Sequence, residues 1–197
     1  CSGWAQTSSL PYGVSFIDAA AVEGCLHIYV PGGAGCGIVP KATVLHAAPL
    51  TPGAGALGAW SELAAFPLPS GTAANVTLAA KGHVYVIGGR FLEPAIKDVY
   101  YAPVRPDHSL GPWVNDPSVY LPRALNEASG AVWRDRLLVT GGFFTNEQGT
   151  VDFSSNVYVS KLPSGEAPVT ATASFTAAGL SEGAHTVQAS AVDLAGN

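Results

Sequence analysis

An internal repeat limits what this chain can fold into more than any other feature of its sequence. Trp4, Trp60 and Trp113 are separated by 56 and 53 residues, and three Gly-Gly pairs are separated by the same two intervals. A Leu-Pro pair and an apolar stretch also recur in each repeat. These further markers are Leu10-Pro11, Leu68-Pro69 and Leu121-Pro122; Gly32-Gly33, Gly88-Gly89 and Gly141-Gly142; and the apolar stretches 44–47, 99–102 and 157–160. Four markers in the same order, three times, indicate a repeated structural unit.

Each repeat has the pattern of four short β-strands. We expect the first strand after Leu-Pro, at 71–80 and 124–133 in the second and third repeats. A tight turn separates it from an apolar second strand, at 26–30, 83–87 and 136–140, which stops at Gly-Gly. The apolar stretch is the third strand, and the tryptophan, a packing element, begins a short outer strand. Gly and Pro make up 38 of 197 residues (23 plus 15), so turns are frequent and an all-β fold is favoured.

These units resemble kelch-type blades of a β-propeller, in the variety found in bacterial extracellular proteins. The resemblance depends on the run from Gly82 to Gly89 (Gly-His-Val-Tyr-Val-Ile-Gly-Gly) and on Leu57-Gly58-Ala59-Trp60, and it covers about residues 1–162. It implies three four-stranded blades, at about 4–62, 60–115 and 113–162. Kelch propellers serve as interaction scaffolds, glycan binders and enzyme bodies, so the resemblance implies a fold and leaves the function open. The third repeat departs from the others in a long loop from 143 to 155.

The number of blades is too small for a closed ring, because propellers have four to eight. Three interpretations remain open. The chain is a fragment of a longer protein, two chains together form six blades, or the blades form an open array. All three rest on the need to cover the edges of the sheets.

The pattern changes after the third repeat. Residues 163–168, rich in Pro and Gly, are typical of a linker. The segment 169–197 alternates in polarity, and its Leu180 to Val187 stretch and Asp193 to Asn197 end resemble the last strands of a bacterial Ig-like module. A complete sandwich needs about 100 residues, so this segment is a partial one.

The three cysteines bear on the compartment. Cys25 and Cys36 bracket one glycine-rich turn and are candidates for a disulfide, for two free thiols or, with His27, for a metal site that lacks a fourth ligand. We therefore predict no metal centre. Cys1, followed by Ser2 and Gly3, resembles the mature end of a bacterial lipoprotein and is a candidate for lipidation; the alternative is an arbitrary fragment boundary. A secreted or cell-surface location follows as an expectation.

Charge and motifs exclude several functions. The chain has 9 Lys and Arg against 14 Asp and Glu, which argues against nucleic-acid binding. No apolar run is long enough to be a transmembrane segment. None of the five histidines lies at a catalytic spacing from Cys, Ser or Asp, so we expect structural or surface roles for them and predict no catalytic residue and no cofactor. These histidines are His27, His46, His83, His108 and His185.

The loops at one rim are the predicted binding face, because loops carry the functional residues of rigid β scaffolds. Aromatic rings beside Arg, Asn and Glu suit sugars or peptides. The candidates that follow a Leu-Pro or a Gly-Gly pair are Tyr12, Arg90, Phe91, Glu93, Arg123, Asn126, Phe143, Phe144, Asn146 and Glu147.

Three hypotheses for the function follow. The first is a non-catalytic extracellular or cell-surface binding and structural module of a bacterial multidomain protein, with a protein or glycan ligand. The second is a self-assembling fibre or sheath subunit, with copies of itself as partners. The third is a fragment of a propeller enzyme, similar to copper-radical oxidases or sialidases.

Overall fold

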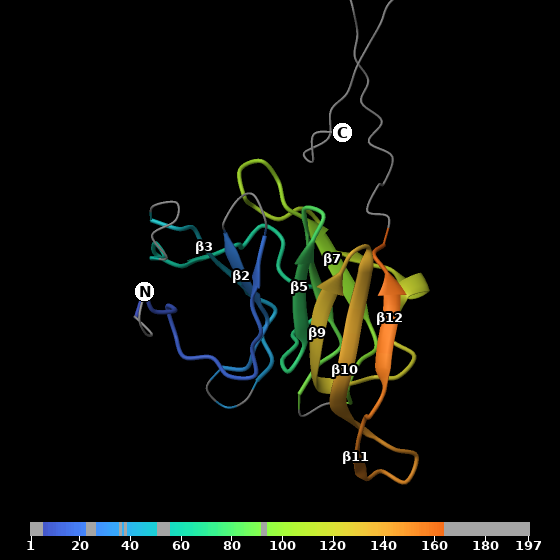
Figure 1. The fold of residues 1–197 in the computed structure, drawn as a ribbon. Helices are drawn as coiled ribbons and strands as arrows, with labels where there is room; N and C mark the ends of the chain where they lie inside the picture. Colours follow the sequence, from blue (N-terminus) through green and yellow to red (C-terminus); the bar gives the residue numbers. More distant parts are fainter. Residues whose placement is uncertain are drawn as a thin grey trace, which may run out of the picture. The chain divides into compact units, whose positions relative to one another are not determined.

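The computed structural model describes residues 6–22, 27–35, 37, 39–50, 56–91 and 94–163 (Figure 1). The described residues form three antiparallel four-stranded sheets, one for each repeat. The chain divides into two units after Pro163. The predicted linker residues 164–168 and the predicted Ig-like segment 169–197 lie outside the described residues, so the predictions for them are not tested. The same holds for Cys1, Trp4, Cys25, Cys36 and Glu93.

The first two sheets have the predicted four strands in sequence order. The first sheet consists of β1 (Ala20–Ala21), β2 (Ile28–Pro31), β3 (Val44–Ala47) and β4 (Ser61–Glu62). The second consists of β5 (Val76–Ala80), β6 (His83–Ile87), β7 (Val99–Pro103) and β8 (Val114–Asn115). The outer strands β4 and β8 each begin directly after a repeated tryptophan. A short 3₁₀ helix, η1 (Pro117–Val119), leads to the third sheet.

The third sheet differs from the other two in its fourth strand. β9 (Asn126–Trp133) and β12 (Val157–Lys161) flank the long β10 (Arg136–Thr145), and β11 (Val151–Phe153) pairs with the far end of β10. In the described part of the chain, no strand takes the outer position that β4 and β8 occupy. The prediction of a continuous loop at 143–155 was wrong in part, because residues 143–145 continue β10 and pair with 151–153 of β11, which leaves 146–150 and 154–155 outside strands.

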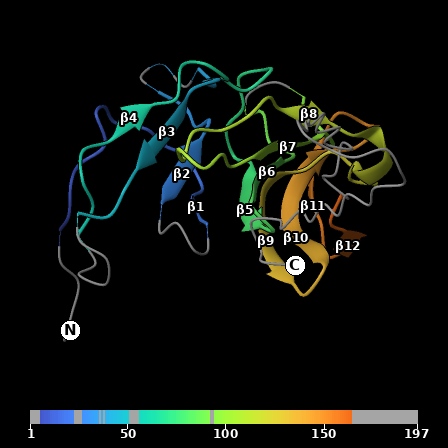
Figure 2. The same ribbon diagram turned by 90° about the horizontal axis from the view of Figure 1, so that it is seen from above.

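The second and third strands of each repeat are confirmed within a residue or two, apart from the extension of β10. The first strands begin later than predicted, at Val76 and Asn126, because the preceding backbone turns toward the neighbouring sheet. Figure 2 shows β1, β5 and β9 innermost, with β4 and β8 at the periphery. This is the arrangement of propeller blades.

Two apolar seams hold the three blades together. In the seam between the first and second blades, Tyr29 and Val44 pack against Val84 and Val86. In the seam between the second and third blades, Tyr85 and its neighbours pack against Leu137 and Val139. The residues of β6 alternate between the two seams, as the period of two along a strand requires. Burial beside Tyr101 raises the pKa of Tyr85 to about 12, so its phenol stays neutral in the seam.

The innermost backbone forms a repeated hydrogen-bonded chain between blades. Phe16, Ala74 and Glu127 each lie six residues after the leucine of a Leu-Pro pair, and their φ angles are 52°, 57° and 52°. The Ala74 N–H donates to the Phe16 carbonyl, and the Glu127 N–H donates to the Ala74 carbonyl, both at 2.8 Å. The repeat therefore fixes how each blade joins the next, in backbone as well as in side chains.

The Gly-Gly markers belong to the same connection. The N–H of Gly33 donates to the Thr72 carbonyl at 2.8 Å, and the N–H of Gly89 donates to the Leu125 carbonyl at 2.7 Å. Each second glycine thus binds the backbone of the following blade. Gly33 and Gly89 both have a positive φ, and a Cβ on either would meet residues of its own blade, Ile17 beside Gly33 and the backbone of 73–75 beside Gly89, which explains why glycine recurs there.

The repeated tryptophans Trp60 and Trp113 occupy equivalent positions in the first two blades. The indole N–H of Trp60 donates to the Ser8 carbonyl at 3.2 Å, and that of Trp113 donates to the Phe66 carbonyl at 3.0 Å. Ser8 and Phe66 each precede the leucine of a Leu-Pro pair by two residues. Both tryptophans are half-buried, because each covers the outer part of its blade.

Candidate functional site

The β10–β11 hairpin forms one wall of a pocket at the Gly-Gly end of the blades. Figure 1 shows β11 projecting beyond the other strands at this end. The pocket has a volume of about 540 Å³. Its lining residues are Pro94, Ala95, Arg123, Ala124, Phe144, Thr145, Asn146, Glu147, Gln148 and Asp152. The structure therefore brings together four of the predicted binding residues, Arg123, Phe144, Asn146 and Glu147.

Arg123 and Phe144 form the junction between the hairpin and the body of the blade. The guanidinium carbon of Arg123 lies 4.0 Å from the centroid of the Phe144 ring, a cation–π contact. Phe144 is buried and packs in the seam between the second and third blades, whereas Arg123 is exposed. The ring therefore orients the guanidinium, whose planar donors remain available to a ligand in the pocket.

The tip of the hairpin is held by Asn146. Its side-chain oxygen accepts hydrogen bonds from the N–H groups of Gln148 and Thr150, at 3.1 and 3.0 Å. The Asn146 N–H donates to the Thr150 carbonyl at 2.9 Å. Asn146 thus shapes the turn, and the exposed Glu147 and Gln148 at the tip are presented to solvent. The sequence prediction gave Asn146 a binding role without this structural one.

The opposite face of the hairpin is aromatic. Phe143 of β10 is opposite Phe153 of β11, and Phe144 is opposite Asp152. Because side chains alternate along a strand, the two pairs lie on different faces. Phe153 is 78% exposed and Phe143 is half-buried. The hairpin thus turns Phe144 and Asp152 toward the pocket and Phe143 and Phe153 away from it.

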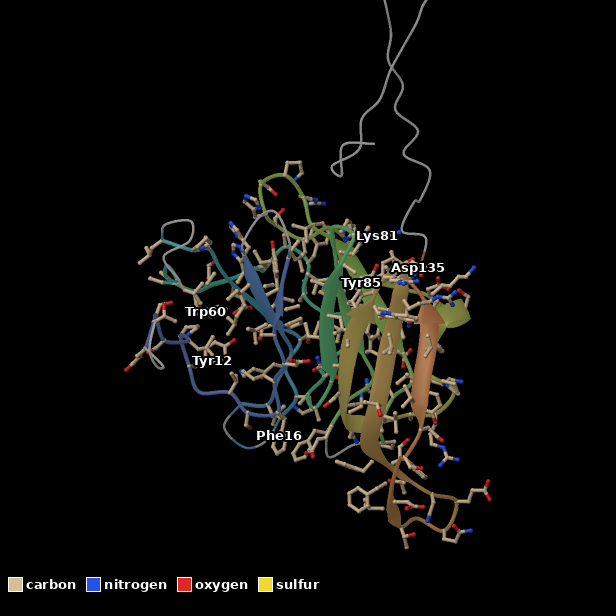
Figure 3. The ribbon with its side chains drawn as sticks, in the orientation of Figure 1. Tyr12, Phe16, Trp60, Lys81, Tyr85 and Asp135 are labelled. Atoms are coloured by element: carbon tan, nitrogen blue, oxygen red, sulfur yellow. The ribbon has the colours of Figure 1, made fainter. Side chains whose placement is uncertain are left out.

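The other predicted binding residues lie apart from this pocket. The Tyr12 hydroxyl is 3.1 Å from the Thr43 hydroxyl, and the Lys41 ammonium lies 4.7 Å from the centroid of the Tyr12 ring. Arg90 donates to the Ser70 hydroxyl, and the Phe91 ring stacks on Phe16 with a centroid distance of 3.9 Å. Asn126 is buried at the start of β9, opposite Phe143. Figure 3 shows Tyr12 and Phe16 on the side of the blades away from Lys81 and Asp135.

A smaller hollow of about 310 Å³ lies where the innermost strands meet. Asp18 and Glu127 contribute carboxylates to it, beside Asn75 and Ser129. One oxygen of Asp18 accepts the Thr77 N–H at 2.8 Å, so this carboxylate joins the first blade to the second. Sequence reasoning missed Asp18 because it belongs to no repeated marker.

Three histidines form a cluster in the seam between the first and second blades, at the end opposite the Gly-Gly pairs. The sequence analysis also missed this cluster. The rings of His27 and His46 are hydrogen-bonded to each other through Nδ1 and Nε2. The His27 ring also stacks on His108, with a centroid distance of 3.9 Å, and the Tyr29 hydroxyl donates to the His108 carbonyl at 2.8 Å. His27 and His46 lie on one face of adjacent strands, which the register could have indicated. His108 comes from the β7–β8 loop of the next blade, and no sequence signal placed it there.

This histidine cluster makes stability depend on pH. Burial, together with neighbouring His108, lowers the pKa of His27, and burial with both neighbouring rings lowers the pKa of His46. The unfolded chain therefore binds more protons than the folded one as the pH falls below about 6.5, and the folded state loses stability there. We expect the urea concentration at the midpoint of unfolding to decrease when the pH is lowered from about 7.5 to about 5.5. In His46→Gln this fall should be smaller; an unchanged pH dependence would show that the cluster does not titrate with folding.

The described residues show neither a metal centre nor a membrane helix. No group of three or more His, Cys, Asp or Glu in this part of the chain is arranged to hold a metal ion. Among the same residues there is no helix with the length and apolar character needed to cross a bilayer.

Comparison with known proteins supports the fold. No family model matches the chain, and no curated protein does either. Among solved structures, it is similar to the structure of YjhT, a kelch-repeat β-propeller protein, with a TM-score of 0.59 and 15% sequence identity. The match covers 80% of this chain and 45% of the YjhT chain. The three sheets are therefore propeller-type blades, and the chain spans less than half the length of this relative.

Proposed function

We propose that this chain is a non-catalytic binding module of an extracellular or cell-surface protein, and that its hairpin pocket binds a glycan. The observation that carries the proposal is the convergence of Arg123, Asn146, Glu147 and Asp152 around one pocket at the loop end of a rigid β scaffold. Guanidinium, amide and carboxylate groups donate and accept the hydrogen bonds that hydroxyl groups of a sugar need.

The pocket favours a polar ligand over an apolar one. Among the described residues that line it, the one aromatic ring is that of Phe144, which is buried and has the Arg123 guanidinium over it. Stacking of a sugar inside the pocket would therefore use the guanidinium plane. The exposed Phe153 on the other face of the hairpin is a further apolar contact for a ligand longer than the pocket, and it makes a protein ligand the second candidate.

The positions of the arginines support a binding role over an enzymatic one. Arg90 contacts Ser70, Arg105 lies over Phe66 and Arg123 lies over Phe144, so the three do not form one anion-binding cluster. The extracellular location rests on the resemblance to bacterial extracellular blades. The lipidation candidate Cys1 and the disulfide candidates Cys25 and Cys36 lie outside the described residues.

A glycan array with two matched variants tests the proposal. Arg123→Ala removes the guanidinium from the pocket. Arg105→Ala is its control, because Arg105 also lies over a phenylalanine ring, at 4.7 Å, but in the loop at the other end of the blades. We expect the wild type and Arg105→Ala to bind the same glycans. Arg123→Ala should lose about 1.5–3 kcal/mol, roughly 10- to 150-fold in affinity, as expected for a hydrogen bond to a charged group.

Two results would count against this proposal. A folded protein that binds no glycan on the array, but captures envelope protein through the hairpin, would make the ligand a protein. Equal loss of glycan binding in the two variants would place the site elsewhere. A parallel oxidase and glycosidase screen tests the enzyme alternative, since turnover in the wild type would contradict a purely binding role.

A further inference from the structure

The face of the third blade that points away from the second blade carries exposed apolar side chains, with Arg136 and Lys161 at one end and Ser129 and Thr140 at the other. Trp133 of β9 and Val157 and Val159 of β12 are 57%, 62% and 55% exposed. Leu138 of β10 lies opposite Val159 in the register and is half-buried. Ala131 completes this row on β9, opposite Leu138. We call this surface, made of Trp133, Ala131, Leu138, Val157 and Val159, the trailing face.

The equivalent face of the second blade is buried against the third blade, so the two faces can be compared residue by residue. Its row Leu78, Tyr85 and Tyr101 matches the row Ala131, Leu138 and Val159 position by position, counted from the two hairpin turns. Tyr85 and Tyr101 are buried against the third blade, as is Val99, the counterpart of Val157. The trailing face therefore matches a blade-binding surface at these four positions, whereas Ser129 and Thr140 stand where the second blade has the buried Val76 and Ile87.

The first blade, at the other end of the array, has the kind of surface against which a trailing face packs. In the second seam the third blade contributes Leu121, Leu125 and Leu137. Their counterparts in the first blade, counted from the Leu-Pro and Gly-Gly markers, are Leu10, Val14 and Ile28. Leu121, Leu125 and Leu137 are 7%, 1% and 2% exposed. The residues of the first blade are apolar but only half-buried. We call this second surface, made of Leu10, Val14 and Ile28, the leading face.

We propose that the trailing face of one copy of this chain binds the leading face of a second copy, and that two such contacts close a ring of six blades. The two complementary faces lie on one chain, at opposite ends of its array, so each copy offers what the other needs. The matched region corresponds to 45% of the YjhT chain, so two copies supply about as many blades as that propeller. A head-to-tail contact that repeats and closes gives a two-fold ring.

Light scattering coupled to size-exclusion chromatography tests this on the chain of residues 1–197. At tens of micromolar we expect the mass of two chains. Val159→Asp, on the trailing face, and Leu10→Asp, on the leading face, should each be monomeric at the concentration where the wild type is a dimer. Val39→Asp is the control, because Val39 is 64% exposed and belongs to neither face; this variant should remain dimeric. Circular dichroism and a thermal melt establish that each variant is folded.

Mixing the two monomeric variants tests the head-to-tail geometry. Val159→Asp keeps an intact leading face and Leu10→Asp keeps an intact trailing face, so the mixture should form a dimer that neither variant forms alone. A wild type that stays monomeric at this concentration would overturn the proposal and would leave blades from a longer chain as the occupant of the trailing face. Dimers that persist in Val159→Asp, or a mixture that stays monomeric, would also overturn it. None of these outcomes depends on the glycan proposal.

Discussion

Gly89→Val is expected to lower the free energy of unfolding by roughly 2–6 kcal/mol. Gly89 has a φ of 84°, where a β-branched side chain is strained, at a cost of about 1–3 kcal/mol. A Cβ at this position would also lie 2.5 Å from the Ala73 carbonyl oxygen and 2.7 Å from the Asn75 nitrogen. Both atoms belong to the backbone, so relieving the overlap displaces the connection between blades and adds about 1–3 kcal/mol. Urea denaturation followed by tryptophan fluorescence measures the change.

Gly82→Val is the matched control for this prediction. Gly82 also has a positive φ, of 67°, but a Cβ there would have no atom within 4 Å. We therefore expect only the strain component, about 1–2 kcal/mol. Equal destabilisation by the two variants would mean that the close approach of the backbone of residues 73–75 to Gly89 does not contribute.

Tyr85→Ala is expected to cost about 3–5 kcal/mol, the usual range for truncating a buried aromatic side chain. Tyr85 is 1% exposed and packs in the seam between the second and third blades. The variant removes the ring from the centre of this seam, and the backbone on either side is too constrained by strand pairing to close the cavity. The same denaturation measurement applies.

Phe153→Ala serves as the control for Tyr85→Ala. Phe153 is an aromatic residue on a strand of the third sheet, but it is 78% exposed. Its removal should change the free energy of unfolding by less than about 0.5 kcal/mol. A large loss at Phe153, or none at Tyr85, would contradict the assignment of the seam as the interface that stabilises the array.

Much of the fold could be predicted because the repeat presents each unit three times. The Gly-Gly pairs marked the end of the second strand in the first two repeats, and the apolar stretches marked the second and third strands of every repeat. The β10–β11 hairpin could not be predicted in this way, because 143–155 has no counterpart in the other repeats. Nor could the position of Asn126, which strand pairing buries although it follows a Leu-Pro loop.

The candidate site was predictable in part for the same reason. Loops after Leu-Pro and loops after Gly-Gly emerge at one end of the blades, so Arg123 and Phe144 were expected on one rim. Their direct contact depends on how far the hairpin folds back, which single-sequence reasoning does not give. Arg90 and Tyr12 satisfied the same sequence rule, yet they contact Ser70 and Thr43 in other parts of the rim.

The most direct test of the binding site is hydrogen–deuterium exchange of residues 1–197, with and without the glycan that binds most strongly on the array. Backbone amides in the β10–β11 hairpin and at Ala95 and Ala124 should become protected when the glycan is bound, since these segments line the pocket. Amides in the loop 105–110, at the opposite end of the blades, should not change. Protection confined to that loop, or no change in the hairpin at saturating glycan, would contradict the proposed site.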